Sequence, residues 1–133
     1  MTQIQRTLSI LPGYFSICRL GPHDAIPEWA IQRDVDFFTI TQTRDELSII
    51  CPQQNVPLDD NLTVDRDWRC LKLEGPFDMD EPGVMAALAT PLAEAGVSVF
   101  AEATYDTDYL VVNQLEAAVQ SLESLGHTVR EAS

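Results

Sequence analysis

An internal repeat is the feature of this 133-residue sequence that most limits its possible folds. Residues 17–24 (ICRLGPHD) are similar to residues 71–78 (LKLEGPFD), with Gly21 and Gly75 offset by 54 positions. Farther along, residues 38–51 (FTITQTRDELSIIC) are similar to residues 100–113 (FAEATYDTDYLVVN) at an offset of 62. The offset grows by eight residues, which is about two helical turns. Two copies of one unit, with a shortened helix in the first copy, account for both matches.

The second copy, residues 65–133, has a pattern of six elements. We expect strands over residues 68–74, 97–104, 108–113 and 127–131, where apolar residues alternate or run together. The first helix, over residues 83–95, carries an apolar stripe of Val84, Met85, Leu88 and Leu92. The second helix has an apolar face of Leu115, Val119 and Leu122. The order β-α-β-β-α-β predicts a ferredoxin-like unit.

Five residues should begin, interrupt or end these helices. Asn113 should cap the second helix, with Glu116 three residues later in a capping-box arrangement. Gly96 and Gly126 should end the two helices as C′ glycines. Pro91 should kink or break the first helix, because proline lacks the N–H that an interior position requires.

The first copy, residues 1–64, is abbreviated. We expect strands over residues 7–11, 14–20, 36–43 and 46–51, with a short helix near Trp29. The polar segment 52–64 replaces the last helix and connects the copies, and it is short enough that both should pack as one compact body. The predicted fold class is α+β, with tandem βαββαβ modules that have antiparallel sheets and helices on one face.

The turn ahead of the first helix of the second copy is the main candidate for a binding site. Asp80 and Glu81 should accept hydrogen bonds from the first free N–H groups, and Pro82 suits the first helical position. Gly83 should leave this helix end open to another molecule. Because an open helix N-terminus favours a carboxylate, the turn predicts capture of a small metabolite. In the first copy Glu28 follows Pro27, so we expect one principal site per chain.

The charge of the chain excludes several classes of partner. Its 21 acidic and 8 basic side chains give a net charge of −13, whereas nucleic-acid binding needs clustered Lys and Arg. The same acidity argues against anionic membrane surfaces, and no apolar segment is long enough to span a bilayer. Cys18, Cys51 and Cys70 form no CxxC pair, so we expect buried, reduced thiols in a cytoplasmic protein.

The repeat, the turn and the second hairpin together resemble the ACT domain family of small-molecule regulatory modules. Residues 80–85 (DEPGVM) are similar to the Asp-x-Pro-Gly-aliphatic turn of that family, and residues 92–100 (LAEAGVSVF) to its helix end and second strand. Residues 104–112 (TYDTDYLVV) are similar to the signature of the paired-ACT subfamily, which includes small bacterial and fungal proteins and the cytosolic arginine sensors. The resemblance covers residues 8–129.

This resemblance implies tandem ACT modules that hold an amino acid, which could be a basic one. Carried over by position, Asp108 pairs with the cationic end of the ligand, and Asp80 is a second acidic contact. Thr104 and Tyr105 lie along the pocket, and the turn contributes Phe77, Gly83 and Val84. The chain departs from the subfamily at Glu102 and Ala103, where an aliphatic residue and a serine are usual.

Local chemistry offers other interpretations of these acidic residues. Asp106 and Asp108 could serve only the turn between two strands, since Asp accepts local backbone N–H groups; the resemblance favours a ligand role for Asp108 and not for Asp106. Glu46 occupies the place of Asp108 when the copies are aligned at an offset of 62. Asp78, Asp80 and Glu81 lack the rest of a calcium loop, so we expect no metal and no cofactor.

The sequence leaves three classes of function to consider. The first is an amino-acid-binding regulatory protein, an allosteric sensor, without catalysis. The second is a protein-interaction module that has lost its ligand, because exposed sheet edges commonly pair across a two-fold axis to give a homodimer. The third, an enzyme, is disfavoured, because neither His23 nor His127 has a nucleophile partner in the sequence and no P-loop, GxSxG or HExxH motif occurs.

Overall fold

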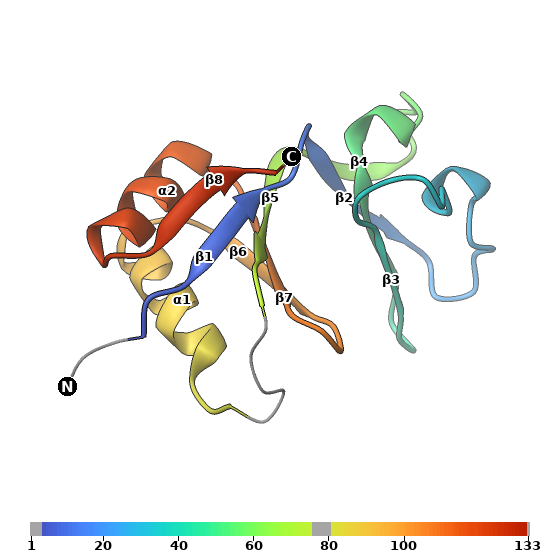
Figure 1. The fold of residues 1–133 in the computed structure, drawn as a ribbon. Helices are drawn as coiled ribbons and strands as arrows, with labels where there is room; N and C mark the ends of the chain where they lie inside the picture. The colour runs from blue at the N-terminus through green and yellow to red at the C-terminus, as the bar shows by residue number, and fades with distance from the viewer. Residues whose placement is uncertain (1–3, 76–80, 133) are drawn as a thin grey trace. The chain divides into compact units, whose positions relative to one another are not determined.

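A computed structural model describes residues 4–75 and 81–132 (Figure 1). The described chain contains eight strands, two α-helices and two short 3₁₀ helices in the order β1 (Thr7–Ile10), β2 (Phe15–Leu20), η1 (Glu28–Ala30), β3 (Thr39–Gln42), β4 (Leu47–Pro52), η2 (Gln53–Asn55), β5 (Thr63–Leu73), α1 (Val84–Glu94), β6 (Val99–Ala103), β7 (Asp108–Val112), α2 (Leu115–Ser124) and β8 (Thr128–Glu131). Neither α-helix is long and apolar enough to cross a membrane.

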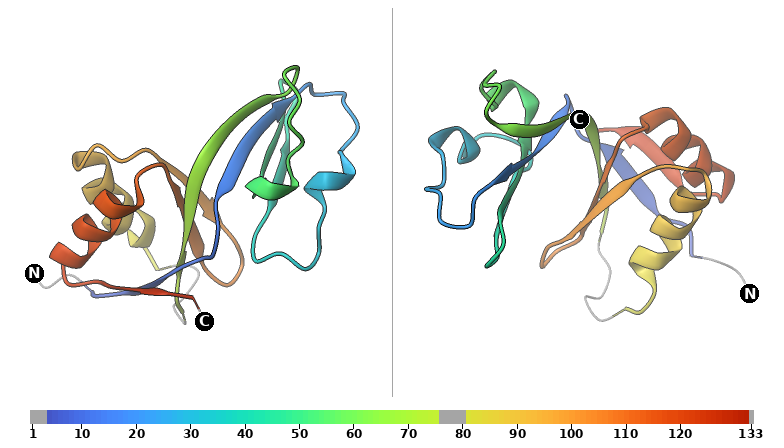
Figure 2. Two further views of the ribbon diagram at one scale, coloured as in Figure 1. Left: turned by 90° about the horizontal axis from the view of Figure 1, so that it is seen from above. Right: turned by 180° about the vertical axis from the view of Figure 1, so that it is seen from behind.

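The chain divides into two compact units. The helical unit contains the described residues of Met1–Pro12 and Arg69–Ser133, and the strand unit is Gly13–Trp68. The predicted order β-α-β-β-α-β is confirmed for β5, α1, β6, β7, α2 and β8. The sheet of the helical unit has the order β6–β7–β5–β1–β8, and both helices cover one of its faces (Figure 2).

Strand β1 lies in the helical unit, although residues 7–11 were expected to belong to the first copy. Leu8 of β1 pairs with Leu73 of β5 in an antiparallel ladder and with Val129 of β8 in a parallel one. The parallel pair differs from the purely antiparallel sheets that the sequence predicted. Strand β5 is shared in turn, because its first part pairs with β2 and its second part pairs with β1 and β7. Strand β1, which comes before β2 in the chain, thus pairs in the sheet of the helical unit, and the first part of β5 pairs in the sheet of the strand unit.

One hydrophobic core holds the helices of the helical unit against its sheet. Helix α1 buries Val84, Leu88 and Leu92, as its apolar stripe predicted. Helix α2 buries Ala118 and Leu122. The strands contribute the rest of the buried cluster, namely Leu8, Ile10, Leu71, Leu73, Leu110 and Val112, together with Val97. Every second residue of β7 therefore faces the helices, from Val112 back through Leu110.

The ends of the helices are only partly as predicted. Gly96 and Gly126 do end α1 and α2, with φ of 79° and 92°, and the next residue in each case bonds back to the carbonyl of Leu92 or Leu122. Asn113 does not cap α2; its side chain accepts a hydrogen bond from the Ser98 N–H at 2.9 Å, and Gln114 occupies the cap position. Helix α1 continues through Pro91 to Glu94.

The strand unit has a four-stranded antiparallel sheet of order β3–β4–β2–β5. The short helix expected near Trp29 is the single 3₁₀ turn η1, and no α-helix occurs in this unit. Its core comprises Cys18, Ala30, Leu47, Ile49, Cys51 and Val56. All three cysteines of the chain are buried and free of disulfides, and burial raises the pKa of the Cys70 thiol to about 12.

The β3–β4 and β6–β7 hairpins correspond at an offset of 61 residues, not 62. Thr43 and Thr104 occupy the same position, since each N–H bonds to the carbonyl three residues later, at Glu46 or Thr107. Strand pairing agrees, because Gln42 pairs with Leu47 as Ala103 pairs with Asp108. Glu46 therefore matches Thr107, and Asp108 matches Leu47. The equivalence of Glu46 and Asp108 was wrong, because a slip of one residue moves a side chain to the other face of a strand.

Strand β5 contains a bulge at Asp67, which has a left-handed φ of 71°. Between the pairs Ile17–Asp65 and Phe15–Trp68, β5 has one more residue than β2. The Gln53 side chain secures the bulge, because its Oε1 accepts a hydrogen bond from the Asp67 N–H at 2.6 Å and its Nε2 donates one to Asp67 Oδ1 at 3.0 Å. Aspartate and asparagine tolerate this backbone conformation better than most other residues.

Replacing Asp67 with alanine should lower the free energy of unfolding by about 1–2 kcal/mol, because alanine is strained at this φ and loses the bond from Gln53. Asp67→Asn keeps an oxygen acceptor and a tolerated φ, so it should stay within about 0.5 kcal/mol of the wild type. Urea unfolding of both variants measures this. Equal losses in the two variants would show that backbone conformation is not what selects Asp67.

Candidate functional site

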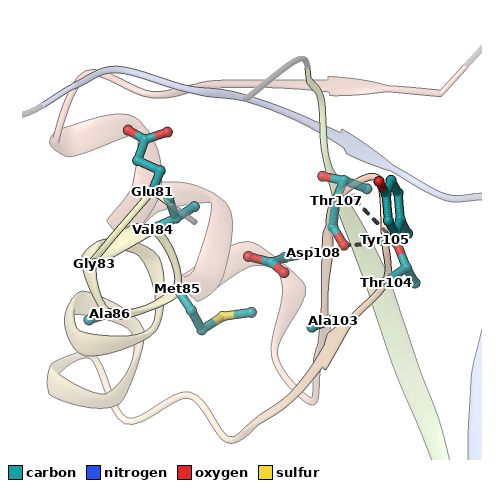
Figure 3. Close-up of a pocket in the computed structure, with 10 residues that line it drawn as sticks. All are labelled: Glu81, Gly83, Val84, Met85, Ala86, Ala103, Thr104, Tyr105, Thr107 and Asp108. Carbon is teal, nitrogen blue, oxygen red and sulfur yellow. Dashed lines mark hydrogen bonds between the residues drawn. The ribbon is translucent and has the colours of Figure 1, made fainter. Parts of the chain in front are cut away.

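A cavity of about 360 Å³ lies between the N-terminus of α1 and the β6–β7 hairpin (Figure 3). Its described lining is Glu81, Gly83, Val84, Met85, Ala86, Ala103, Thr104, Tyr105, Thr107 and Asp108. Five of the residues proposed from sequence, Gly83, Val84, Thr104, Tyr105 and Asp108, are brought together here. The other two, Phe77 and Asp80, fall outside the described residues.

Gly83 provides the wall of the cavity at the start of α1. The helix begins at Val84, and the N-cap residue Gly83 has a left-handed φ of 79°. Pro82 therefore precedes the helix, whereas the sequence predicted that it would be the first helical residue. A Cβ atom placed on Gly83 would meet nothing within 4 Å, so backbone conformation rather than close approach requires glycine.

The N-terminus of α1 has no side-chain cap among the described residues. The first intrahelical bond runs from the Ala87 N–H to the Gly83 carbonyl, and the N–H groups of the preceding turn have no partner within a helix. Val84, Met85 and Ala86 of that turn all line the cavity. This end of α1 therefore presents partial positive charge to the cavity.

The hairpin wall is held by its two threonines. The Thr104 hydroxyl donates to the Thr107 carbonyl at 2.9 Å and accepts the Thr107 N–H at 3.2 Å. The Thr107 hydroxyl, which is buried, donates to the Leu73 carbonyl of β5. Thr104 thus shapes the turn, and its hydroxyl proton is already used. Tyr105 is 84% exposed and lines the rim of the cavity at the tip of the hairpin.

Asp108 is the acidic residue that faces α1. It begins β7 on the same face as Leu110 and Val112, and Figure 3 shows its carboxylate directed toward the helix. Burial raises the pKa of this carboxyl group above its usual range, because a half-buried charge loses hydration. No hydrogen bond or ion pair is found for this side chain within residues 4–75 and 81–132. A cationic group that entered the cavity would supply the missing partner.

Glu102 and Ala103, where the chain departs from the subfamily pattern, lie on opposite faces of the sheet. Ala103 pairs with Asp108 and lines the cavity, whereas Glu102 pairs with Tyr109 on the opposite face of the sheet. Burial raises the pKa of the Glu102 carboxyl group. The extra charge of Glu102 thus does not enter the cavity, and the change at position 103 removes only a possible hydroxyl.

Glu81 is a site residue whose role the sequence did not indicate. Its carboxylate was expected to cap α1, but its Oε1 accepts a hydrogen bond from Arg6 Nη2 at 2.6 Å in an ion pair. The two side chains are 27% and 15% exposed, respectively. They are 75 positions apart, so no local pattern could have predicted this pair.

His127 fixes the backbone of Arg6. The imidazole is 4% exposed, and its Nδ1 accepts the Arg6 N–H at 2.9 Å. Burial, and then the charge of Arg6, lower the pKa of His127. Because its Nδ1 is an acceptor, the ring must be in its neutral form.

Acidification should therefore destabilise the protein through His127. The folded pKa lies below the ordinary value of 6.5, so the unfolded chain binds the proton first and the free energy of unfolding falls as the pH drops below that value. Urea unfolding at pH 7.5 and pH 5.5 measures the difference. His127→Gln should flatten this dependence, whereas His23→Gln, at an exposed position, should leave it unchanged. An unaltered pH dependence in His127→Gln would contradict this assignment.

Metal binding receives no support from side-chain clustering. No group of three or more His, Cys, Asp or Glu residues that could hold an ion is found in the part of the chain that the structure describes.

Comparison with known proteins supplies the family. The model of the ACT domain matches residues 63–124, and the model of an N-terminal domain matches residues 13–59. The structure of protein Atu0741 from Agobacterium tumefaciens is similar over 98% of this chain and 97% of that one, with 37% identity and a TM-score of 0.89. The chain belongs to the ACT domain family.

Two further proteins are similar to this ACT-domain protein, one in sequence and one in fold. Human CASTOR3P is 32% identical over an alignment of 87 residues that covers 57% of this chain and 53% of CASTOR3P, so the chain spans about half the length of that relative. The regulatory subunit of aspartate kinase from Thermus flavus shares the fold, with a TM-score of 0.59 and 13% identity over 89% of this chain and 95% of that one. The likeness to that subunit concerns the fold.

Proposed function

We propose that this ACT-domain protein binds a free amino acid and acts as a regulatory sensor without catalytic activity. The observation that carries the proposal is a half-buried carboxylate, Asp108, which faces across one cavity a helix N-terminus that no side chain among the described residues caps. An amino acid carries opposite charges that suit these two walls. Its carboxylate would meet the N–H groups at the start of α1, and its ammonium group or a basic side chain would pair with Asp108.

The size and lining of the cavity support a small metabolite. Its volume of about 360 Å³ lies at the low end of the range for ligand pockets, roughly 300–1,000 Å³. The described lining contains no histidine, cysteine, lysine or arginine. It therefore offers a cation-binding group but neither a thiol nor an imidazole for nucleophilic or general-base chemistry.

A thermal-shift screen against the twenty amino acids tests this proposal. An amino acid present at 100 times its dissociation constant should stabilise the protein by about 2.7 kcal/mol. We expect L-arginine and L-lysine among the hits, because Asp108 has no cationic partner among the described residues. An unchanged melting curve with all twenty would contradict the proposal.

An assembly module without a ligand is the second candidate. Strand β6 pairs only with β7 among the described strands, and its Phe100 is 42% exposed. A free sheet edge of this kind can pair with a second copy. Light scattering with and without the amino acids separates the two candidates, because a constant dimer that no amino acid affects would favour the assembly module.

A further inference from the structure

Two carboxylates belong to the cavity, and they are not equivalent. Asp108 has no ion pair among the described residues, whereas Glu81 is neutralised by Arg6 across 2.6 Å. In Figure 3 the Glu81 carboxylate points away from Asp108 and out of the space between α1 and the hairpin. The cavity therefore presents one uncompensated negative charge from its described lining, although it has two acidic residues.

Arg6 contacts Glu81 from outside the main cavity, which it does not line. It lines a neighbouring cavity of about 140 Å³ that shares Glu81, Gly83 and Val84 with the main one. Its backbone is fixed on both sides, because the N–H of Arg6 bonds to His127 Nδ1 and its carbonyl accepts the Thr128 N–H at 2.9 Å. With its main chain held in this way and its side chain only 15% exposed, Arg6 has little freedom to release Glu81.

We propose that Arg6 sets the charge selectivity of the main cavity by holding the Glu81 carboxylate out of it. This inference rests on the proposed function. Glu81 lies two residues before the N-cap Gly83, so without Arg6 its carboxylate could turn toward the start of α1. A second negative charge there would repel the carboxylate of an amino acid and attract a second cation. Arg6 is thus a positioning residue that acts through Glu81.

The test compares L-arginine with agmatine, which has the same cationic groups but no carboxylate. Calorimetry gives the affinity of each probe for the wild type, Arg6→Gln and the double variant Arg6→Gln/Glu81→Gln. In Arg6→Gln the ratio of L-arginine to agmatine affinity should fall about tenfold or more. In the double variant the ratio should return to near the wild-type value, because no carboxylate remains to turn inward.

A structural tether would behave differently. If Arg6 only fixed the chain, Arg6→Gln would weaken both probes equally and Glu81→Gln would not restore the ratio. Either result, or an unchanged ratio in Arg6→Gln, would overturn the inference.

A second measurement does not depend on amino-acid binding. Sodium acetate should shift the backbone amide NMR signals of Val84, Met85 and Ala86 in the wild type. The shifts should be smaller in Arg6→Gln and should return to the wild-type size in the double variant. Equal shifts in all three proteins, or none in the wild type, would contradict the role of Arg6. The predicted acetate pattern without binding of any amino acid would instead defeat only the proposed function.

Discussion

Replacing Leu110 with alanine should lower the free energy of unfolding by about 2–5 kcal/mol, the usual cost of a cavity in a packed core. Leu110 is fully buried at the centre of β7, where it pairs with Leu71 of β5 and Ala101 of β6. It belongs to the cluster that holds both helices on the sheet. Because Leu110 follows Asp108 by two residues on the same face, its packing also fixes the strand that carries the proposed ligand contact.

The control for this prediction is Leu125→Ala at the end of α2. Leu125 is 39% exposed, so the same change of side chain should cost less than about 1 kcal/mol there. Chemical unfolding of both variants gives the comparison. Similar losses at the two positions would mean that the β7 core is not packed as described.

Replacing Asp108 with asparagine should weaken binding of a basic amino acid by about 2 kcal/mol or more, which is roughly 30-fold in the dissociation constant. The change keeps the size of the side chain and removes the charge that faces α1. Asp106→Asn is the matched control, because this exposed turn residue is two positions away and does not line the cavity. Calorimetry should show wild-type affinity for Asp106→Asn. Equal effects of the two variants would indicate long-range attraction by an acidic surface rather than a contact.

The sequence predicts well those features that depend on neighbouring residues. The apolar stripe of α1 and the glycines that end both helices follow from helical spacing and from a left-handed C′ position. The repeated hairpin motif places Asp108 at the start of a strand, and the turn motif places Gly83 at the start of a helix. The structure brings these two segments to one cavity.

Features that depend on pairing between residues far apart in the chain could not be predicted from the sequence. Strand β1 precedes β2 in the chain but pairs with β5 and β8, and no local pattern specifies such an exchange. Alignment on similar letters also misplaced the hairpins by one residue, because only the ladder between Ala103 and Asp108 fixes the register. The Arg6–Glu81 pair joins residues that are 75 positions apart, so Glu81 looked like a helix cap when considered alone.

A crystal structure of the protein grown with a saturating concentration of L-arginine tests the central claim most directly. We predict density for the amino acid in the main cavity, with its carboxylate at the N–H groups of Val84 and Met85 and a cationic group within hydrogen-bond distance of Asp108. The Arg6–Glu81 pair should remain closed beside it. An empty cavity, or L-arginine bound elsewhere on the chain, would contradict the account.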